Sequence, residues 1–131
     1  EGITAYCVTH NIRFLFGCGS IPGCDPAALK IPLSYLYHYH LAPEEIRPRA
    51  LPQRHIEMNQ RLIGDIDRKT GLKSVPPLIK GYLRIGGFVG DGAVIDEQFQ
   101  TTDVCIVVQT KLITEKYARY FERRGSNFQA I

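Results

Sequence analysis

Two segments of the chain carry apolar side chains on both faces of an extended backbone. The first is residues 13–20, RFLFGCGS, in which Phe14 and Leu15 point to opposite faces. The second is residues 99–110, FQTTDVCIVVQT, in which every position from 104 to 108 is apolar. Such patterns are typical of strands covered on both sides. We therefore expect two inner strands of a layered sheet.

Helical spacing predicts helices before and after the first of these strands. Residues 1–11 read as the end of a helix that its final asparagine closes in a left-handed cap. Asp25 and Pro26 favour a helix start, with the aspartate as N-cap and the proline in the first turn. We expect this second helix, or helix pair, to run to about His40 and to be interrupted at Pro32.

Two further helices are expected in the second half of the chain. The clearer one covers residues 74–87 and opens at Ser74. Its apolar face is predicted to consist of Val75, Leu78, Ile79, Tyr82 and Leu83. The last helix begins at Thr114 and ends at Gly125, and residues 126–131 read as a tail. This order of helices and strands predicts an α/β layered sheet.

The segment 43–73 differs in character from the rest of the chain. It holds seven basic and five acidic residues, several prolines and few large apolar side chains. We expect a long irregular excursion with one short helix near 58–67. Segments of this length inside a compact domain are often functional.

Residues 82–92, YLRIGGFVGDG, place four glycines within seven positions. The spacing matches neither of the glycine-rich motifs that bind phosphate groups, and the stretch follows a helix rather than a strand. We expect Gly86 and Gly87 to end the preceding helix, and Gly90 and Gly92 to flank a turn at Asp91.

Composition narrows the class of protein. The chain has 131 residues, 44% of them hydrophobic, which suits a single domain over 1–131. Its net charge of +3 is too small to indicate nucleic-acid binding. No apolar run approaches the roughly 20 residues of a membrane span. The four cysteines include no C-x-x-C pair, so we predict no metal site and expect a reducing cytoplasm.

Three segments together resemble a known family. They are FGCGSIPGCDP, SYLYHYHLAPEEIRPRAL and PPLIKGYLRIGGFVGDGAVIDEQFQTTDVCIVV. All three are similar to segments of the ornithine-lipid N-acyltransferases, whose relatives are often labelled hemolysin-like. That family is GNAT-like, that is, similar to the acyl-CoA N-acyltransferases. The resemblance covers roughly residues 1–121 and implies a layered mixed sheet flanked by helices.

The resemblance also implies an activity. The family moves a 3-hydroxy fatty acyl group from acyl carrier protein to the α-amine of ornithine, the first step of ornithine lipid synthesis. The implied donor is acyl-acyl carrier protein, or acyl-CoA, with no covalently bound cofactor and no metal. The chain looks like the C-terminal half of such a protein, incomplete at its N-terminus. The loop that holds the donor in GNAT folds would then lie upstream of Glu1.

Acylation of an amine needs a general base, and three residues are candidates for the catalytic step. His38 and His40 have side chains that titrate near neutral pH, although they diverge on a helix. The favoured alternative is that one lies at the surface while the other is a partly buried, hydrogen-bonded structural histidine. Ser20 follows a buried strand, where α/β sheets often bind ligands, but it lies in no G-x-S-x-G motif.

Four charged residues are candidates for binding substrate. Lys80 and Arg84 lie one helical turn apart and could hold a phosphate or the ornithine carboxylate, or form a solvated helix face. Asp96 and Asp103 could hold the ornithine ammonium, although Asp103 could simply start a strand. Among the acidic residues Asp96 ranks first, because the sequence gives it no local role.

Two rival functions and several partners remain open. One rival is an acyl-homoserine-lactone-synthase-like acyltransferase, and the other is a non-catalytic, hemolysin-like binding or membrane-interacting protein. The arginines of the segment 43–73 could steer acidic acyl carrier protein or contact anionic lipid head groups. We expect a cytoplasmic protein, which is peripheral to the inner membrane if these arginines contact lipid head groups. We also expect self-association through an exposed edge strand.

Overall fold

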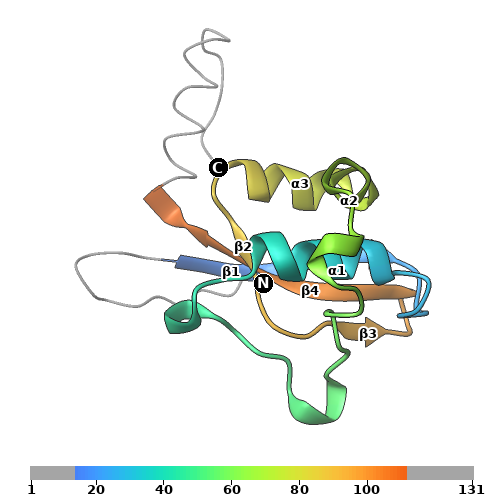
Figure 1. Cartoon of the computed structure of the whole chain (residues 1–131). Helices are drawn as coiled ribbons and strands as arrows, with labels where there is room; N and C mark the ends of the chain where they lie inside the picture. Colours follow the sequence, from blue (N-terminus) through green and yellow to red (C-terminus); the bar gives the residue numbers. More distant parts are fainter. Residues whose placement is uncertain (1–13, 112–131) are drawn as a thin grey trace, which may run out of the picture.

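The computed structural model describes residues 14–111 (Figure 1). Its strands are β1 (Phe14–Pro22), β2 (Phe88–Val89), β3 (Val94–Asp96) and β4 (Thr101–Gln109). Its α-helices are α1 (Lys30–His40), α2 (Arg68–Ser74) and α3 (Pro77–Arg84). Three 3-10 helices lie between α1 and α2, namely η1 (Glu44–Ile46), η2 (Pro52–Arg54) and η3 (Ile63–Asp65). The expectations for residues 1–11 and for the helix from Thr114 lie outside the described residues.

The four strands form one open antiparallel sheet. β4 lies in its middle, with β1 on one side and both β2 and β3 on the other. The longest pairing runs from Phe14 opposite Gln109 to Pro22 opposite Thr101. Helix α3 packs on β1 and β4, and α1 packs on β2 and on α2. The predicted α/β class is confirmed, and a GNAT-like arrangement is consistent with it.

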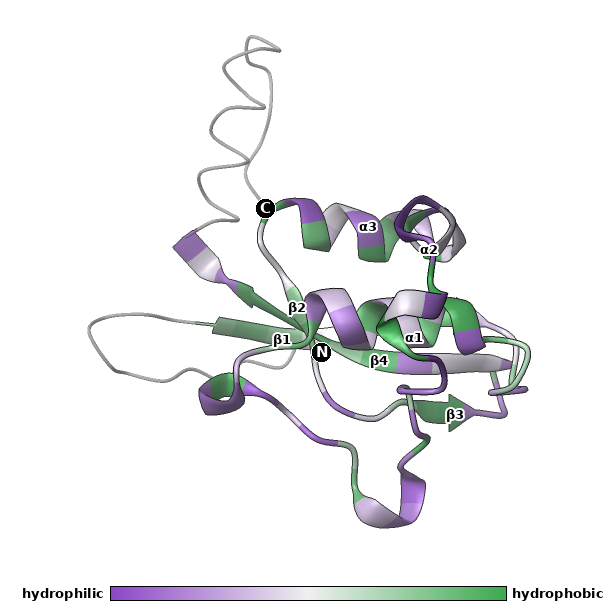
Figure 2. Cartoon of the chain, viewed as in Figure 1, coloured by the Kyte–Doolittle hydropathy of each residue, from purple (hydrophilic) through white to green (hydrophobic). Residues whose placement is uncertain are grey.

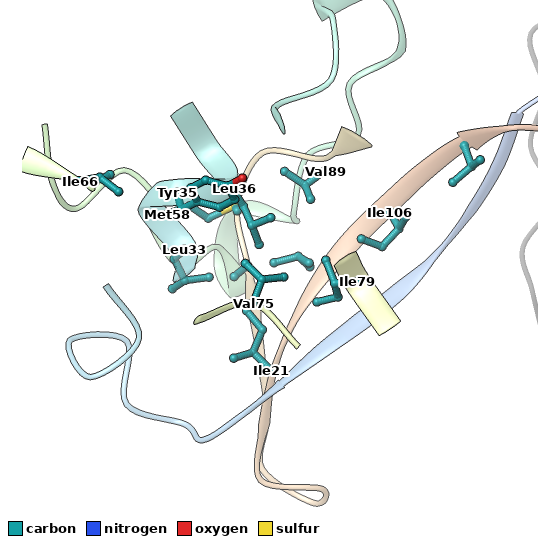
Figure 3. Packing of buried hydrophobic residues seen from close by; sticks show 13 residues of the cluster. Ile21, Leu33, Tyr35, Leu36, Met58, Ile66, Val75, Ile79, Val89 and Ile106 are labelled. Carbon is teal, nitrogen blue, oxygen red and sulfur yellow. The ribbon is translucent and has the colours of Figure 1, made fainter. Parts of the chain in front are cut away.

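The hydrophobic core lies between the sheet and the helices (Figure 3). Ile79 of α3 is 1% exposed and reaches the backbone of β1 at Gly19, where a Cβ atom would lie 2.7 Å from Cγ1 of the isoleucine. The absence of a side chain at this glycine therefore lets the helix approach the strand closely. Leu33 and Leu36 of α1 are both 0% exposed and close the core from the side of that helix.

The two predicted inner strands differ in burial. In β4 every residue from 104 to 108 is buried except Cys105, which is partly buried, so the prediction of an inner strand is confirmed. The same prediction for β1 is wrong within the described residues, because Leu15 is 37% exposed and Cys18 is exposed. The reason is that the side chains of a strand alternate between the two faces of the sheet, and α3 packs on the face of Gly19, so Cys18 on the opposite face stays exposed.

Helix α1 begins four residues later than predicted, at Lys30 with Leu29 as its N-cap. The Asp25 carboxylate accepts a hydrogen bond from the backbone N–H of Ala27, and so forms a turn rather than the cap of a helix. Pro32 does not interrupt the helix. It is buried in the first turn, where its missing N–H would have had no partner inside the helix.

Helix α2 lies at Arg68–Ser74, after the predicted 58–67. Its position is fixed by Asp67, whose side chain accepts hydrogen bonds from the hydroxyl and the backbone N–H of Thr70. These two bonds lower the pKa of the Asp67 carboxyl. Ser74 therefore ends α2 rather than opening the next helix.

Helix α3 is shorter than predicted because it starts at Pro77. Its predicted apolar face is right for Ile79 but wrong for Leu78, which is 66% exposed. Gly86 has φ 91°, and the N–H groups of Gly86 and Gly87 donate to carbonyls of the last helical turn. This is the predicted glycine cap. Figure 2 shows hydrophobic residues alternating with hydrophilic ones along this helix.

Candidate functional site

The segment 43–73 is irregular but docked against the glycines of the stretch 82–92. A Cβ atom on Gly90 would lie 2.7 Å from the carbonyl oxygen of Pro48. Gly92 has φ 92°, and a Cβ atom there would overlap the ring of His55. Both glycines therefore permit a close approach of two chain segments that no side chain would allow. The predicted turn at these glycines is also the dock for the excursion.

Four backbone hydrogen bonds fasten this contact. Asp91 donates its N–H to Pro48 at 2.8 Å and accepts from Ala50 at 3.0 Å. Ile56 and Ala93 exchange both N–H···O bonds, at 2.8 and 2.9 Å. Main-chain pairing of this kind is independent of side-chain chemistry. These hydrogen bonds hold the segment around η2 beside the chain that leads into β3.

The Asp91 side chain adds charge to the same contact. Its carboxylate oxygens lie 3.8 Å from Nε of Arg49 and 3.8 Å from Nε2 of His55. Because the arginine is half exposed, this ion pair adds little stability.

A cleft of about 440 Å³ opens between η2 and β3. Its walls are Gln53, Arg54, His55, Ile56, Ile95, Asp96 and Glu97. The guanidinium of Arg54 is anchored across it by a hydrogen bond from Nη2 to the carbonyl of Ile95, at 3.0 Å. Two basic and two acidic side chains thus border one cleft, together with two isoleucines. Its volume is in the range of about 300–1,000 Å³ typical of small-molecule sites.

Asp96 is the residue that sequence reasoning ranked first among the acids, and it does line this cleft. The expectation that it has no local role is wrong, because its Oδ1 atom accepts a hydrogen bond from the N–H of Phe99 at 3.2 Å. The bond orders the turn between β3 and β4. The second carboxylate oxygen of Asp96 takes no part in that hydrogen bond and can accept from other donors.

His40 lies at the end of α1, half-buried against aromatic rings. Its Nε2 atom is 3.0 Å from the hydroxyl of Tyr35, and the two rings are 5.2 Å apart. Burial and, to a smaller extent, the positive charge of Arg68 lower the pKa of this imidazole. The guanidinium of Arg68 stacks over Tyr39, with 4.9 Å to the ring centroid. The histidine is therefore neutral at pH 7.

His38 occupies a different environment, as the predicted divergence of the two histidines requires. Its Nε2 donates to the carbonyl of Arg61 at 2.7 Å, which ties α1 to the chain just before η3. The ring also meets Tyr37 edge-on. This histidine is thus occupied by a bond between helix and excursion.

Ser20 and Asp103 are brought together by the sheet, because they lie opposite each other in the pairing of β1 with β4. The serine hydroxyl donates to Oδ1 of the aspartate at 2.8 Å, and the hydroxyl of Thr101 donates to the same atom at 2.9 Å. The serine is exposed, and the other two residues are partly buried. The aspartate accepts from two hydroxyl groups, and within 14–111 no base that could activate the serine bonds to it.

Lys80 and Arg84 lie on α3 and border neither the cleft nor the histidines. Lys80 is half-buried and Arg84 is exposed. No ion pair joins either of them to another residue within 14–111. In the same part of the chain, no group of three or more His, Cys, Asp or Glu side chains could hold a metal ion. Nor is any described helix long and apolar enough to cross a membrane.

The candidate residues therefore fall into five separate places, and the structure adds three residues to one of them. Arg54, His55 and Glu97 border the cleft with Asp96 but were not predicted as site residues. Arg54 stood out in the sequence only as one basic residue of a charged excursion. The signal that could have found the site is the G-D-G stretch, because glycines at a close approach mark where another segment docks.

The comparisons with known proteins find relatives along nearly the whole chain. The chain is 44% identical over 124 residues to an L-ornithine N(alpha)-acyltransferase of Rhodobacter capsulatus, covering 95% of the chain and 47% of that protein. It is 44% identical over 128 residues to the enzyme of the same name from Brucella abortus, covering 98% and 46%. For the Rhizobium meliloti enzyme the identity is 39% over 130 residues, covering 99% and 44%.

The relatives are thus acyltransferases, and the chain spans about half the length of the curated relatives it matches. More particularly, the chain is homologous to the C-terminal region of the L-ornithine N(alpha)-acyltransferase family. The resemblance seen in the sequence is therefore confirmed. No family model matches the chain, and no solved structure matches it.

Proposed function

We propose that the protein containing this chain is an N-acyltransferase that transfers a 3-hydroxy fatty acyl group from acyl carrier protein to the α-amine of ornithine. This would be the first step of ornithine lipid synthesis. The observation that carries the proposal is the identity of 39–44% to enzymes named L-ornithine N(alpha)-acyltransferase over nearly the whole chain. The α/β fold and a cleft bordered by both signs of charge support it.

The proposed reaction is an attack of a neutral amine on a thioester. The α-nitrogen forms a bond to the acyl carbon, the carbon–sulfur bond breaks, and the thiol of the carrier leaves. The proton lost by the nitrogen passes to a general base, and the thiolate takes up a proton. Ornithine must therefore be bound with its α-amine free, while its carboxylate and its side-chain ammonium are held by protein groups.

For the general base we propose His40 rather than His38. Its lowered pKa keeps the imidazole neutral at pH 7, so it can accept a proton. In His38 the Nε2 atom already donates to a backbone carbonyl, which leaves only Nδ1 of that ring to accept a proton. A His40→Gln variant keeps a partner for the Tyr35 hydroxyl, and we expect it to lower kcat by about 10² or more. A kcat within a few-fold of the unsubstituted enzyme would leave His40 a structural role only.

The activity is tested on the complete protein that contains this chain, incubated with 3-hydroxyacyl-acyl carrier protein and ornithine. Mass spectrometry measures N-acylornithine, and a thiol reagent measures the released carrier in equal amount. The matched controls omit ornithine or replace the donor by acyl-CoA. We expect acylation at the α-nitrogen with the carrier-bound donor. If neither donor gives acylated ornithine, the proposed function is wrong.

A further inference from the structure

The charges of Arg54, Asp96 and Glu97 in the cleft between η2 and β3 are not paired with one another. Within residues 14–111, the ion pairs shorter than 4.0 Å join Asp91 to Arg49 and to His55, so the cleft residue His55 has its ionic partner outside the cleft. Neither Asp96 nor Glu97 lies within that distance of a described cationic side chain. Arg54 donates one N–H to the Ile95 carbonyl, and its guanidinium has further N–H groups that can donate to another acceptor. Opposite charges thus face one cleft without neutralising each other.

The framework that carries these charges is fixed before any ligand binds. Gly90 and Gly92 let the excursion approach the backbone, and four main-chain hydrogen bonds close the dock. On the opposite side, Asp96 is oriented by its bond to the Phe99 N–H. A preformed site loses less entropy when it binds a ligand than a loop that must first become ordered.

A ligand that satisfies this arrangement needs an anionic and a cationic group separated by an aliphatic stem. The anion accepts from the guanidinium of Arg54, which suits the bidentate geometry of a carboxylate. The cation donates to the carboxylates of Asp96 and Glu97, and the stem packs on Ile56 and Ile95. An α-amino acid with an amino group at the end of its side chain has these features.

We propose that this cleft is the subsite for the diamino acid acceptor, with Arg54 on the α-carboxylate and the pair Asp96 and Glu97 on the side-chain ammonium. This inference rests on the proposed function, because it assigns the place of its acceptor. The α-amine, which must react as the neutral form, has no acidic partner in this arrangement. The subsite thus distinguishes the two amino groups of ornithine by charge.

The test compares ornithine with norvaline, which has the same chain length but no side-chain ammonium. In the complete protein, Glu97→Gln and Asp96→Asn remove the negative charges, and the asparagine retains an acceptor for the Phe99 N–H. We expect each variant to raise the KM for ornithine about tenfold, the lower end of the range for charge-assisted hydrogen bonds, since the cleft is open. The KM for norvaline and the KM for the acyl donor stay unchanged. Asp65→Asn, an exposed carboxylate outside the cleft, is the matched control.

Calorimetric binding of ornithine to the same proteins separates this inference from the proposed function. If ornithine binding weakens in Glu97→Gln but not in Asp65→Asn, the subsite is supported even when no acyl group is transferred. In that case only the proposed function is wrong. If the unsubstituted protein acylates ornithine and the cleft variants leave its KM unchanged, the subsite is wrong. Equal increases of KM for ornithine and norvaline also overturn it. The Glu97 side chain forms no hydrogen bond or ion pair within 14–111, so its variant is expected to fold.

Discussion

Gly90 tests whether the dock of the excursion depends on the absence of a side chain. In Gly90→Ala the new Cβ atom would lie 2.7 Å from the carbonyl oxygen of Pro48 and 3.0 Å from its Cγ atom. Ordinary van der Waals contact begins at about 3.4 Å, so a backbone oxygen would have to move. That oxygen also accepts the N–H of Asp91 at 2.8 Å, so the movement strains a hydrogen bond of the dock.

The expected cost follows from these contacts. Overpacking by one methyl group costs typically about 1–3 kcal/mol. If the segment relaxes instead, it gives up hydrogen bonds that each contribute about 0.5–1.5 kcal/mol. We therefore expect Gly90→Ala to lower the free energy of unfolding by about 1–3 kcal/mol, and protease cleavage within 43–73 to become faster, because the segment is released locally.

Gly81→Ala is the matched control. Gly81 is an exposed residue inside α3, and a Cβ atom on it would meet nothing within 4 Å. Because glycine is unfavourable inside a helix, this variant should be more stable by about 0.5–1 kcal/mol. Urea unfolding of the complete protein measures both variants. Equal stability of the two, or unchanged proteolysis of Gly90→Ala, would refute the claim that the glycine holds the dock.

Three further predictions concern the core, the pH dependence and the thiols. Ile79→Ala should cost about 2–5 kcal/mol, whereas the neighbouring Leu78→Ala, at a 66% exposed position, should stay within about 0.5 kcal/mol in the same urea assay. Burial lowers the pKa of His40 below its ordinary value of 6.5. When the pH drops below about 6.5, the unfolded chain therefore binds a proton at this histidine before the folded protein does, and the contribution of His40 to stability falls. Urea unfolding at pH 7.5 and 5.5 should show a smaller loss in His40→Gln, and an equal loss would argue against burial as the cause. Burial raises the pKa of Cys105 to about 11, so at pH 8 iodoacetamide should label the exposed Cys18 first, and mass spectrometry of labelled peptides that shows the reverse order would contradict this.

The features that the sequence predicted correctly depend on short-range pattern. The continuous apolar run of β4, the helix that buries Ile79 and its glycine cap at Gly86 are each determined by neighbouring residues. Where a single residue competes for a local bond, the same reasoning failed. Asp25 forms a turn instead of a cap, and Asp67 caps the helix that was expected earlier in the chain.

In the candidate site, too, short-range pattern indicated single residues but not the contacts between distant ones. The sequence singled out Asp96 and Asp103, but it gave no reason to place Asp96 in one cleft with Arg54, or Asp103 beside Ser20. The first placement arises from the dock of the excursion on β3, where Arg54 bonds to the Ile95 carbonyl, and the second from the register of β4 with β1; both connect residues 41 or more positions apart. Periodicity reports which way a side chain points, and carries no information on which distant segment lies opposite.

By itself the sequence determined the α/β class, the identity of its inner strand β4 and the resemblance to ornithine-lipid N-acyltransferases. Only the tertiary structure decided what the glycines between Gly86 and Gly92 do. The first of them ends α3, while Gly92 and its neighbour at position 90 bring a distant segment against the sheet. The physical reason is that a helix cap is a contact within one turn, whereas a dock needs two surfaces, and the chain encodes the second one forty residues away from the first.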